Sequence, residues 1–111
     1  MEFIETAIFT KRIQELLQDD DYRDLQSALT ENPKAGDPIP GGHGLRKIRW
    51  RSPIKGSGKR GGIRVIYYRI SSKTIYMIFA YDKTTQKNLT KQQLKVLMKR
   101  ARLEPESASR L

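Results

Sequence analysis

Arg64 is the residue whose type and setting point most directly to chemistry. It stands one place into the apolar and aromatic stretch 63–68, a composition typical of a β-strand. Strand alternation places Arg64 on the same face as Ile66 and Tyr68. A guanidinium held on a strand keeps its charge and can grip a phosphate through two parallel hydrogen bonds. A structural ion pair with a helix carboxylate is the open alternative.

The segment before this stretch is rich in glycine and cations. Residues 55–62 read Lys-Gly-Ser-Gly-Lys-Arg-Gly-Gly. Glycines allow close backbone approach to a phosphate, and Lys55, Lys59 and Arg60 supply positive charge. The segment is not a Walker loop, because its Lys residues are not followed by Ser or Thr and no helix follows directly. It fits a phosphate-binding loop or a mobile surface turn.

Lys83 and four tyrosines are further candidates. Lys83 follows the apolar stretch 74–81, at the rim of a sheet and near the start of the last helix. There it could stabilise a phosphate dianion or protonate a leaving oxygen, or remain a solvated rim lysine. The tyrosines Tyr67, Tyr68, Tyr76 and Tyr81 could stack on bases. Tyrosines in strands are more often packing residues, and the same holds for Trp50.

The single histidine and the absence of cysteine exclude several classes of site. His43 lies between two glycines with no acid nearby in sequence, which favours a loop residue over an acid–base catalyst. Without cysteine there is no disulfide, and zinc or iron binding is disfavoured. No Ser-His-Asp set or paired-carboxylate site is evident, and the composition fits a reducing cytoplasm.

The net charge is concentrated in one part of the chain, residues 38–81, called the basic segment below. It has ten Lys or Arg residues and no Asp or Glu, within a chain whose formal net charge is +10. The rest of the chain carries equal numbers of acidic and basic residues. A charge-balanced scaffold with one cationic strip predicts binding to a polyanion such as a nucleic acid.

Patterning predicts the order β-α-α-β-β-β-α. Helical spacing of apolar residues marks 7–17, 20–31 and 90–103, with Thr90 as an N-cap and acids opening the second helix. Strand patterns cover 2–6, 45–51, 63–70 and 74–81, the last two forming a hairpin around 71–73. In 45–51, Arg46, Ile48 and Trp50 alternate with three cations that form a strongly cationic face.

These elements predict a single α+β domain over residues 1–111, with 104–111 as a flexible tail. We expect a small antiparallel β-sheet with the helices packed on one face and the other face open and cationic. No apolar run is long enough to span a membrane, and the acidic N-terminus is unlike a signal peptide.

Two further stretches are informative: Gly44-Leu45-Arg46-Lys47-Ile48-Arg49 and the run 58–68, Gly-Lys-Arg-Gly-Gly-Ile-Arg-Val-Ile-Tyr-Tyr. They resemble the RelE/ParE toxin superfamily, and most nearly its HigB-like branch of ribosome-dependent mRNA interferases. The strand ending at Lys83 and the last helix continue the resemblance, which covers most of residues 3–103. It implies a RelE-like fold of the microbial ribonuclease type, and cleavage of mRNA in the ribosomal A site without a metal or other cofactor.

The resemblance also implies roles for individual residues. Arg64 would hold the scissile phosphate and Lys83 would assist from the rim, with Lys55 and Lys59 supporting them from the loop. RNA contacts would come from Arg46, Lys47, Arg49, Arg51 and Arg60. The best-known RelE pattern has a tyrosine near the C-terminus beside the cut site, and residues 82–89 contain none. Tyr81 or Tyr68 would replace it as a base platform, or Lys87 would take a polar role, and the general base stays unassigned.

The implied partners are a cognate antitoxin, often a helix-turn-helix protein, together with the 70S ribosome and mRNA in the cytoplasm. Operator DNA would be reached only through the antitoxin, and no membrane is involved. Two alternatives remain: a ParE-like, non-nucleolytic inhibitor of DNA gyrase, and a plain nucleic-acid-binding module. The dense cationic strip favours cleavage over gyrase inhibition.

Overall fold

The computed structural model describes residues 1–51, 62–83 and 89–108, with side chains described as far as Lys99. The elements follow the predicted order, with one short additional strand. They are β1 (Glu2–Glu5), α1 (Ala7–Leu16), α2 (Asp19–Glu31), β2 (Asp37–Pro38), β3 (Leu45–Trp50), β4 (Ile63–Ser71), β5 (Thr74–Asp82) and α3 (Lys91–Ala108). The predicted α+β class is confirmed, and α3 extends five residues beyond its predicted end at Leu103.

The five strands form one sheet in the order β1-β5-β4-β3-β2. β1 runs parallel to β5, whereas the other neighbours are antiparallel. The sheet is therefore mixed, which corrects the expectation of a wholly antiparallel sheet. Alternation within β1 predicts a strand but carries no information about which neighbour it pairs with or in which direction.

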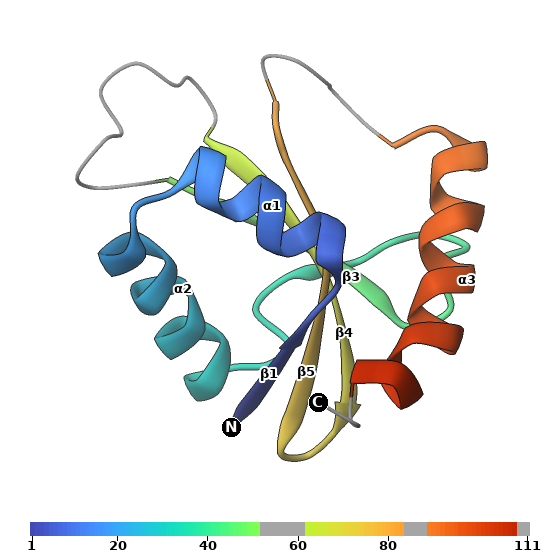
Figure 1. Cartoon of the computed structure of the whole chain (residues 1–111), viewed down its shortest axis with the longest axis horizontal. Coiled ribbons are helices and arrows are strands. Elements are labelled where there is room, and N and C mark those ends of the chain that lie inside the picture. Colours follow the sequence, from blue (N-terminus) through green and yellow to red (C-terminus); the bar gives the residue numbers. More distant parts are fainter. Residues whose placement is uncertain (52–61, 84–88, 109–111) are drawn as a thin grey trace.

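The helices cover both faces of the sheet, which corrects the expectation that they pack on one (Figure 1). α1 and α2 bury Phe9, Ile13 and Leu25 against one face, to which β4 contributes Val65. α3 packs Leu97 against the opposite face. We call these the α1/α2 face and the α3 face. Because α3 covers only part of its face, cations can remain accessible beside it.

Hydrogen bonds at the helix starts agree with the sequence. The Thr6 hydroxyl accepts the Phe9 N–H at 3.0 Å and so caps α1. At α3, the predicted N-cap Thr90 accepts the Gln93 N–H at 3.0 Å, and the Gln93 side chain accepts the Thr90 N–H at 2.9 Å. This reciprocal pair is a capping box, and it fixes where α3 begins.

A β-bulge interrupts the β4–β5 ladder. Ile66 pairs with Phe79 and Tyr67 pairs with Met77, so Ile78 is an extra residue in β5. Its carbonyl oxygen accepts a hydrogen bond from the Thr6 hydroxyl at 2.8 Å. Beyond the bulge the alternation of β5 is reversed, which decides the face on which the end of β5 presents its side chains.

Candidate phosphate-binding site

Arg64 lies near the start of β4, on the α3 face, as alternation predicted. Its neighbour Val65 packs in the core on the opposite face, and Ile66 packs on the α3 face. The Arg64 side chain is 4% exposed, and its Nη1 donates to the Ile63 carbonyl oxygen at 3.5 Å. Burial between neighbouring strands restricts the guanidinium to few orientations, so its N–H groups are fixed in place before any ligand arrives.

Arg64 has a cation on one side and a phenol on the other. Its ladder partner on β3 is Arg49, and its partner on β5 is Tyr81. Burial lowers the pKa of Arg64, and the nearby cations Arg49 and Arg51 lower it further, while Tyr81 acts in the opposite direction. A cation crowded by other cations gains stability when an anion binds, so this arrangement favours a phosphate ligand.

Lys83 extends the cluster from the end of β5. It is exposed, and its backbone N–H donates to the Gly62 carbonyl oxygen at 3.5 Å. Since Tyr81 is directly opposite Arg64, Lys83 is a diagonal neighbour of Arg64, with Cα atoms roughly 7 Å apart. The β-bulge places Tyr81 on the face of Arg64, and Lys83 follows two residues later, just after the end of β5. We call Arg49, Arg64, Tyr81 and Lys83 the β4-start cluster.

Gly62 positions the beginning of β4. Its φ is +65°, and a Cβ atom there would lie 2.2 Å from the Trp50 carbonyl oxygen. Only glycine allows the chain to enter β4 this close to the end of β3. The second glycine of the Gly-Gly pair singled out in the sequence therefore has a structural role in placing Arg64.

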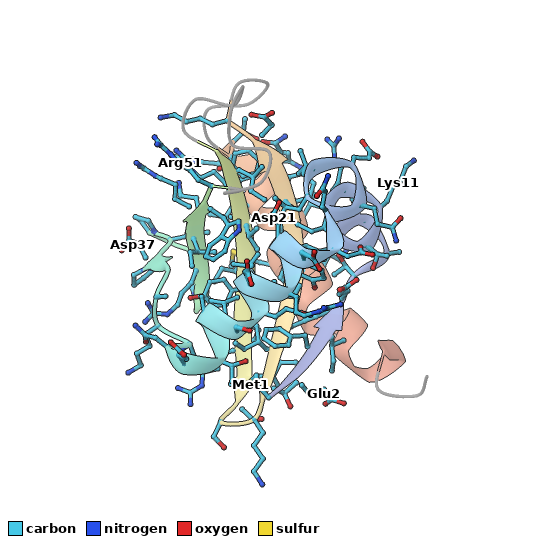
Figure 2. All side chains as sticks on the ribbon, turned by 90° about the vertical axis from the view of Figure 1, so that its left-hand side faces the viewer. Met1, Glu2, Lys11, Asp21, Asp37 and Arg51 are labelled. Atoms are coloured by element: carbon cyan, nitrogen blue, oxygen red, sulfur yellow. The ribbon has the colours of Figure 1, made fainter. Side chains whose placement is uncertain are left out.

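The cations of β3 divide between the two faces. Lys47 and Arg49 lie on the face of Arg64, as their pairing with Ile66 and Arg64 shows. Arg51 follows β3 and is exposed (Figure 2), at the end of the sheet where many side chains carry nitrogen atoms. Arg46 alternates with Lys47 and so lies on the other face of the sheet, where its Nη1 donates to the Gly36 carbonyl oxygen at 2.7 Å. Arg46 is therefore not brought together with the β4-start cluster.

Tyr81 is almost fully buried, at 2% exposure, and its ring stacks on Phe79 with centroids 5.9 Å apart. Its hydroxyl has no hydrogen-bond partner among the described residues. Burial raises the pKa of Tyr81 and Arg64 lowers it. With one ring face on Phe79 and almost no exposed surface, Tyr81 offers the site a neutral hydroxyl more readily than a platform for a base.

Tyr68 lies away from Arg64. It is four residues further along β4, about 13 Å at the usual rise of a strand, and it pairs with Leu45 and Tyr76. Its half-buried ring packs against Gly44, where a Cβ atom would lie 2.9 Å from the ring. His43 is exposed in the turn before β3, as predicted for a loop residue.

Several predicted site residues lie outside the described residues: Lys55, Lys59, Arg60 and Lys87. Their predicted roles stay predictions. One described cation that the sequence did not single out is Lys91, the first residue of α3, which lines a hollow together with Lys47. Its position immediately after the N-cap Thr90 was the available signal. Within the described part of the chain, no three His, Asp or Glu side chains are grouped so that they could hold a metal ion.

The arrangement can bind a phosphodiester and stabilise added negative charge. Arg64 supplies directional N–H groups in a partly dry setting, Arg49 and Lys83 flank it, and Tyr81 offers a hydroxyl. Preorganised donors of this kind act most strongly on charge that develops in a transition state. None of the helices in the described part has the length and apolar character needed to cross a membrane.

No protein-family model matches the chain. Among solved structures, the fold is similar to that of the toxin RelE of E. coli, in a free-state mutant with two arginines replaced by alanine. The TM-score is 0.54, with 20% sequence identity over 78% of this chain and 86% of that one. The similarity shows that the chain has a RelE-like fold.

Proposed function

We propose that this protein is the toxin of a type II toxin–antitoxin system, and that it cleaves translated mRNA in the ribosomal A site. The observation that carries the proposal is the β4-start cluster: a buried, fixed Arg64 with Arg49 opposite it and Lys83 diagonal to it. The similarity to RelE, a protein described as a toxin, supports the proposal at the level of the fold. The quoted stretches at 44–49 and 58–68 favour the HigB-like branch.

The cluster suits cleavage by the neighbouring ribose hydroxyl. In this reaction the 2′-oxygen attacks phosphorus while its proton passes to a general base, and the bond to the 5′-oxygen breaks. The products are a 2′,3′-cyclic phosphate and a 5′-hydroxyl, with the leaving oxygen taking up a proton. Arg64 would bind the non-bridging oxygens, and Lys83 would protonate the leaving oxygen. No step requires a metal ion.

The proposed partners follow from charge and from the resemblance. The cations of the basic segment around the β4-start cluster suit the phosphates of mRNA and of the ribosome. A cognate antitoxin of the helix-turn-helix type would inhibit the toxin. The toxin would be held at operator DNA only through this antitoxin. The proposed site of action is the cytoplasm, where translating ribosomes are found.

Replacing Arg64 tests the proposal. Arg64→Ala should lower ribosome-dependent cleavage by at least about a hundredfold, because it removes the main donor to the developing charge. Primer extension on an mRNA with purified ribosomes measures the cuts, which should fall at in-frame codon positions and be absent without ribosomes. Arg69→Ala is the matched control, since Arg69 is an exposed arginine at the other end of the same strand, and it should leave cleavage unchanged.

Arg64 is buried, so a second variant separates catalysis from folding. Lys83→Ala changes an exposed residue and should lower cleavage without lowering the melting temperature, whereas Lys73→Ala, in the exposed turn before β5, should leave both cleavage and melting temperature unchanged. Circular dichroism checks that each variant is folded. Full toxicity of folded Arg64→Ala on expression would overturn the nuclease proposal and favour gyrase inhibition, which supercoiling assays with purified gyrase would detect.

A further inference from the structure

A hollow of about 230 Å³ lies on the α3 face, outside the β4-start cluster. It is formed by the turn between β2 and β3, by β3 itself and by the start of α3. Its principal lining residues are Ile39, Pro40, Lys47, Leu89, Lys91 and Leu94. We call it the α3 hollow.

The lining combines an apolar floor with two ammonium groups. Ile39, Leu89 and Leu94 are partly buried members of the apolar cluster beneath α3. Lys47 enters from the sheet and is half-buried, whereas Lys91 enters from α3 and is exposed. A ligand that satisfies both parts of this lining has a flat or apolar body and carries negative charge. Nucleotides have this combination.

Two lysines contribute positive charge to the hollow beside the start of α3. The N–H groups of Thr90 and Gln93 are already bonded within the capping box. The nearest carboxylate by strand register is Asp37, the ladder partner of Lys47. Asp37 is exposed at the edge of the sheet, and among the described residues the two form no ion pair. Lys47 therefore remains available to an anion.

The hollow and the β4-start cluster are related through β3. Lys47 and Arg49 share a face and are two residues apart, about 7 Å along the strand. Arg49 is the ladder partner of Arg64. A single nucleotide can span this offset, so an RNA strand with one phosphate at Arg64 can place a neighbouring nucleotide in the hollow.

We propose that the α3 hollow is a nucleotide subsite for the RNA residue next to the cleaved phosphate. Its base packs on Leu94 and Ile39, and its phosphate lies between Lys47 and Lys91. This inference rests on the proposed function, because it takes single-stranded RNA as the substrate. Base contacts with apolar side chains are tolerant of sequence, so the subsite holds the strand in place and contributes little base specificity.

The test uses a fluorescently labelled RNA trinucleotide that is 2′-O-methylated throughout and so resists cleavage. Its affinity for the whole protein is measured by anisotropy over a range of salt concentrations, without ribosomes. Lys91→Ala should weaken binding roughly three- to tenfold and lower the slope of log affinity against log salt by about 0.7, the value for one phosphate contact on a single strand. Leu94→Ala should weaken binding with no change in slope.

Lys99→Ala is the matched control, because Lys99 is an exposed lysine on the same helix, two turns away, about 12 Å along its axis. It should change affinity less than twofold. Amide NMR adds a local readout: the trinucleotide should shift the signals of Ile39 and Leu94, and inorganic phosphate alone should not. Equal shifts with phosphate would reduce the hollow to a simple anion site and overturn the proposal. Shifts with the antitoxin but none with the trinucleotide would assign it to protein recognition instead.

The outcomes separate this inference from the proposed function. If the wild type cleaves mRNA on ribosomes while Lys91→Ala and Leu94→Ala bind the trinucleotide as the control Lys99→Ala does, the subsite is overturned and the proposed function stays in place. If the wild type does not cleave mRNA but binds the trinucleotide in a way that depends on Lys91 and Leu94, the proposed cleavage activity is overturned and the nucleotide site stands.

Discussion

At the scale of single residues, the site depends on how Arg64 and Tyr81 share a buried environment. Arg64 keeps its charge at 4% exposure, with a second arginine opposite it. Tyr81 is buried beside it with a hydroxyl that has no partner among the described residues. A buried hydroxyl without a partner costs stability, of the order of 1–3 kcal/mol. We expect bound substrate to supply the missing partner of this hydroxyl.

Tyr81→Phe removes only this hydroxyl and keeps the ring stacked on Phe79. We expect the free energy of unfolding to stay equal or to rise by about 1 kcal/mol, because a buried unsatisfied group is lost. Cleavage should fall roughly tenfold, the value of one hydrogen bond to the substrate. Urea denaturation and primer extension measure the two effects.

Tyr67→Phe is the control for this substitution. The Tyr67 hydroxyl donates to the Pro33 carbonyl oxygen at 2.8 Å and accepts the Gly36 N–H at 2.9 Å. Its removal should lower stability by about 1–2 kcal/mol, since two buried partners lose their bond. Unchanged cleavage in Tyr81→Phe would show that the hydroxyl takes no part in the reaction.

At the scale of elements, the bulge in β5 connects the fold to the site. Strict alternation from Tyr76 would place Tyr81 on the α1/α2 face, away from Arg64. Because Ile78 is an extra residue, Tyr81 lies on the α3 face instead. Thr6, which is fully buried, bonds the bulged carbonyl and also caps α1. One hydroxyl thus supports both the start of a helix and the geometry of the site.

Thr6→Val keeps the volume of the side chain and removes both hydrogen bonds. We expect a loss of about 2 kcal/mol in the free energy of unfolding, from the lost cap and the unpaired Ile78 carbonyl. Thr6→Ser should restore most of it. Thr30→Val is the control, because the Thr30 hydroxyl is exposed and bonds only within α2, and it should cost less than about 0.5 kcal/mol. Equal effects of Thr6→Val and Thr30→Val in urea denaturation would contradict this role of Thr6.

At the scale of the whole molecule, the dominant property is uncompensated positive charge. The formal net charge is +10, and the basic segment forms the middle of the sheet and its connections. Like charges at the β4-start cluster repel one another when no anion is bound, which lowers the stability of the folded state. Any partner that covers the cluster with acidic groups should therefore stabilise the protein.

Saturation with the cognate antitoxin should raise the melting temperature of the toxin. At about a hundredfold excess over Kd, binding contributes about 2.7 kcal/mol, which corresponds to roughly 10 °C for a domain of this size. Differential scanning fluorimetry measures the shift. Added salt should raise the melting temperature of the free toxin and reduce the increment from the partner, because both act on the same repulsion. A partner that leaves the melting temperature unchanged at saturation would count against an antitoxin that covers the cluster.

The amino-acid sequence by itself determined the elements other than β2, their order and the composition of the cationic strip. Alternation in β4 was enough to place Arg64 with Ile66 and apart from Val65, and Thr90 was recognisable as an N-cap. These features depend on neighbours within a few residues, where backbone geometry fixes the direction of each side chain. Predictions of this local kind were confirmed.

The tertiary structure decided which residues meet. The parallel pairing of β1, the position of α3 on the face of Arg64 and the hollow shared by Lys47 and Lys91 all join distant parts of the chain. The bulge that turns Tyr81 towards Arg64 is bonded to Thr6, 72 residues earlier. Such contacts depend on the free energy of the whole fold and produce no periodic pattern in the sequence. For this reason, alternation alone would have put Tyr81 on the wrong face.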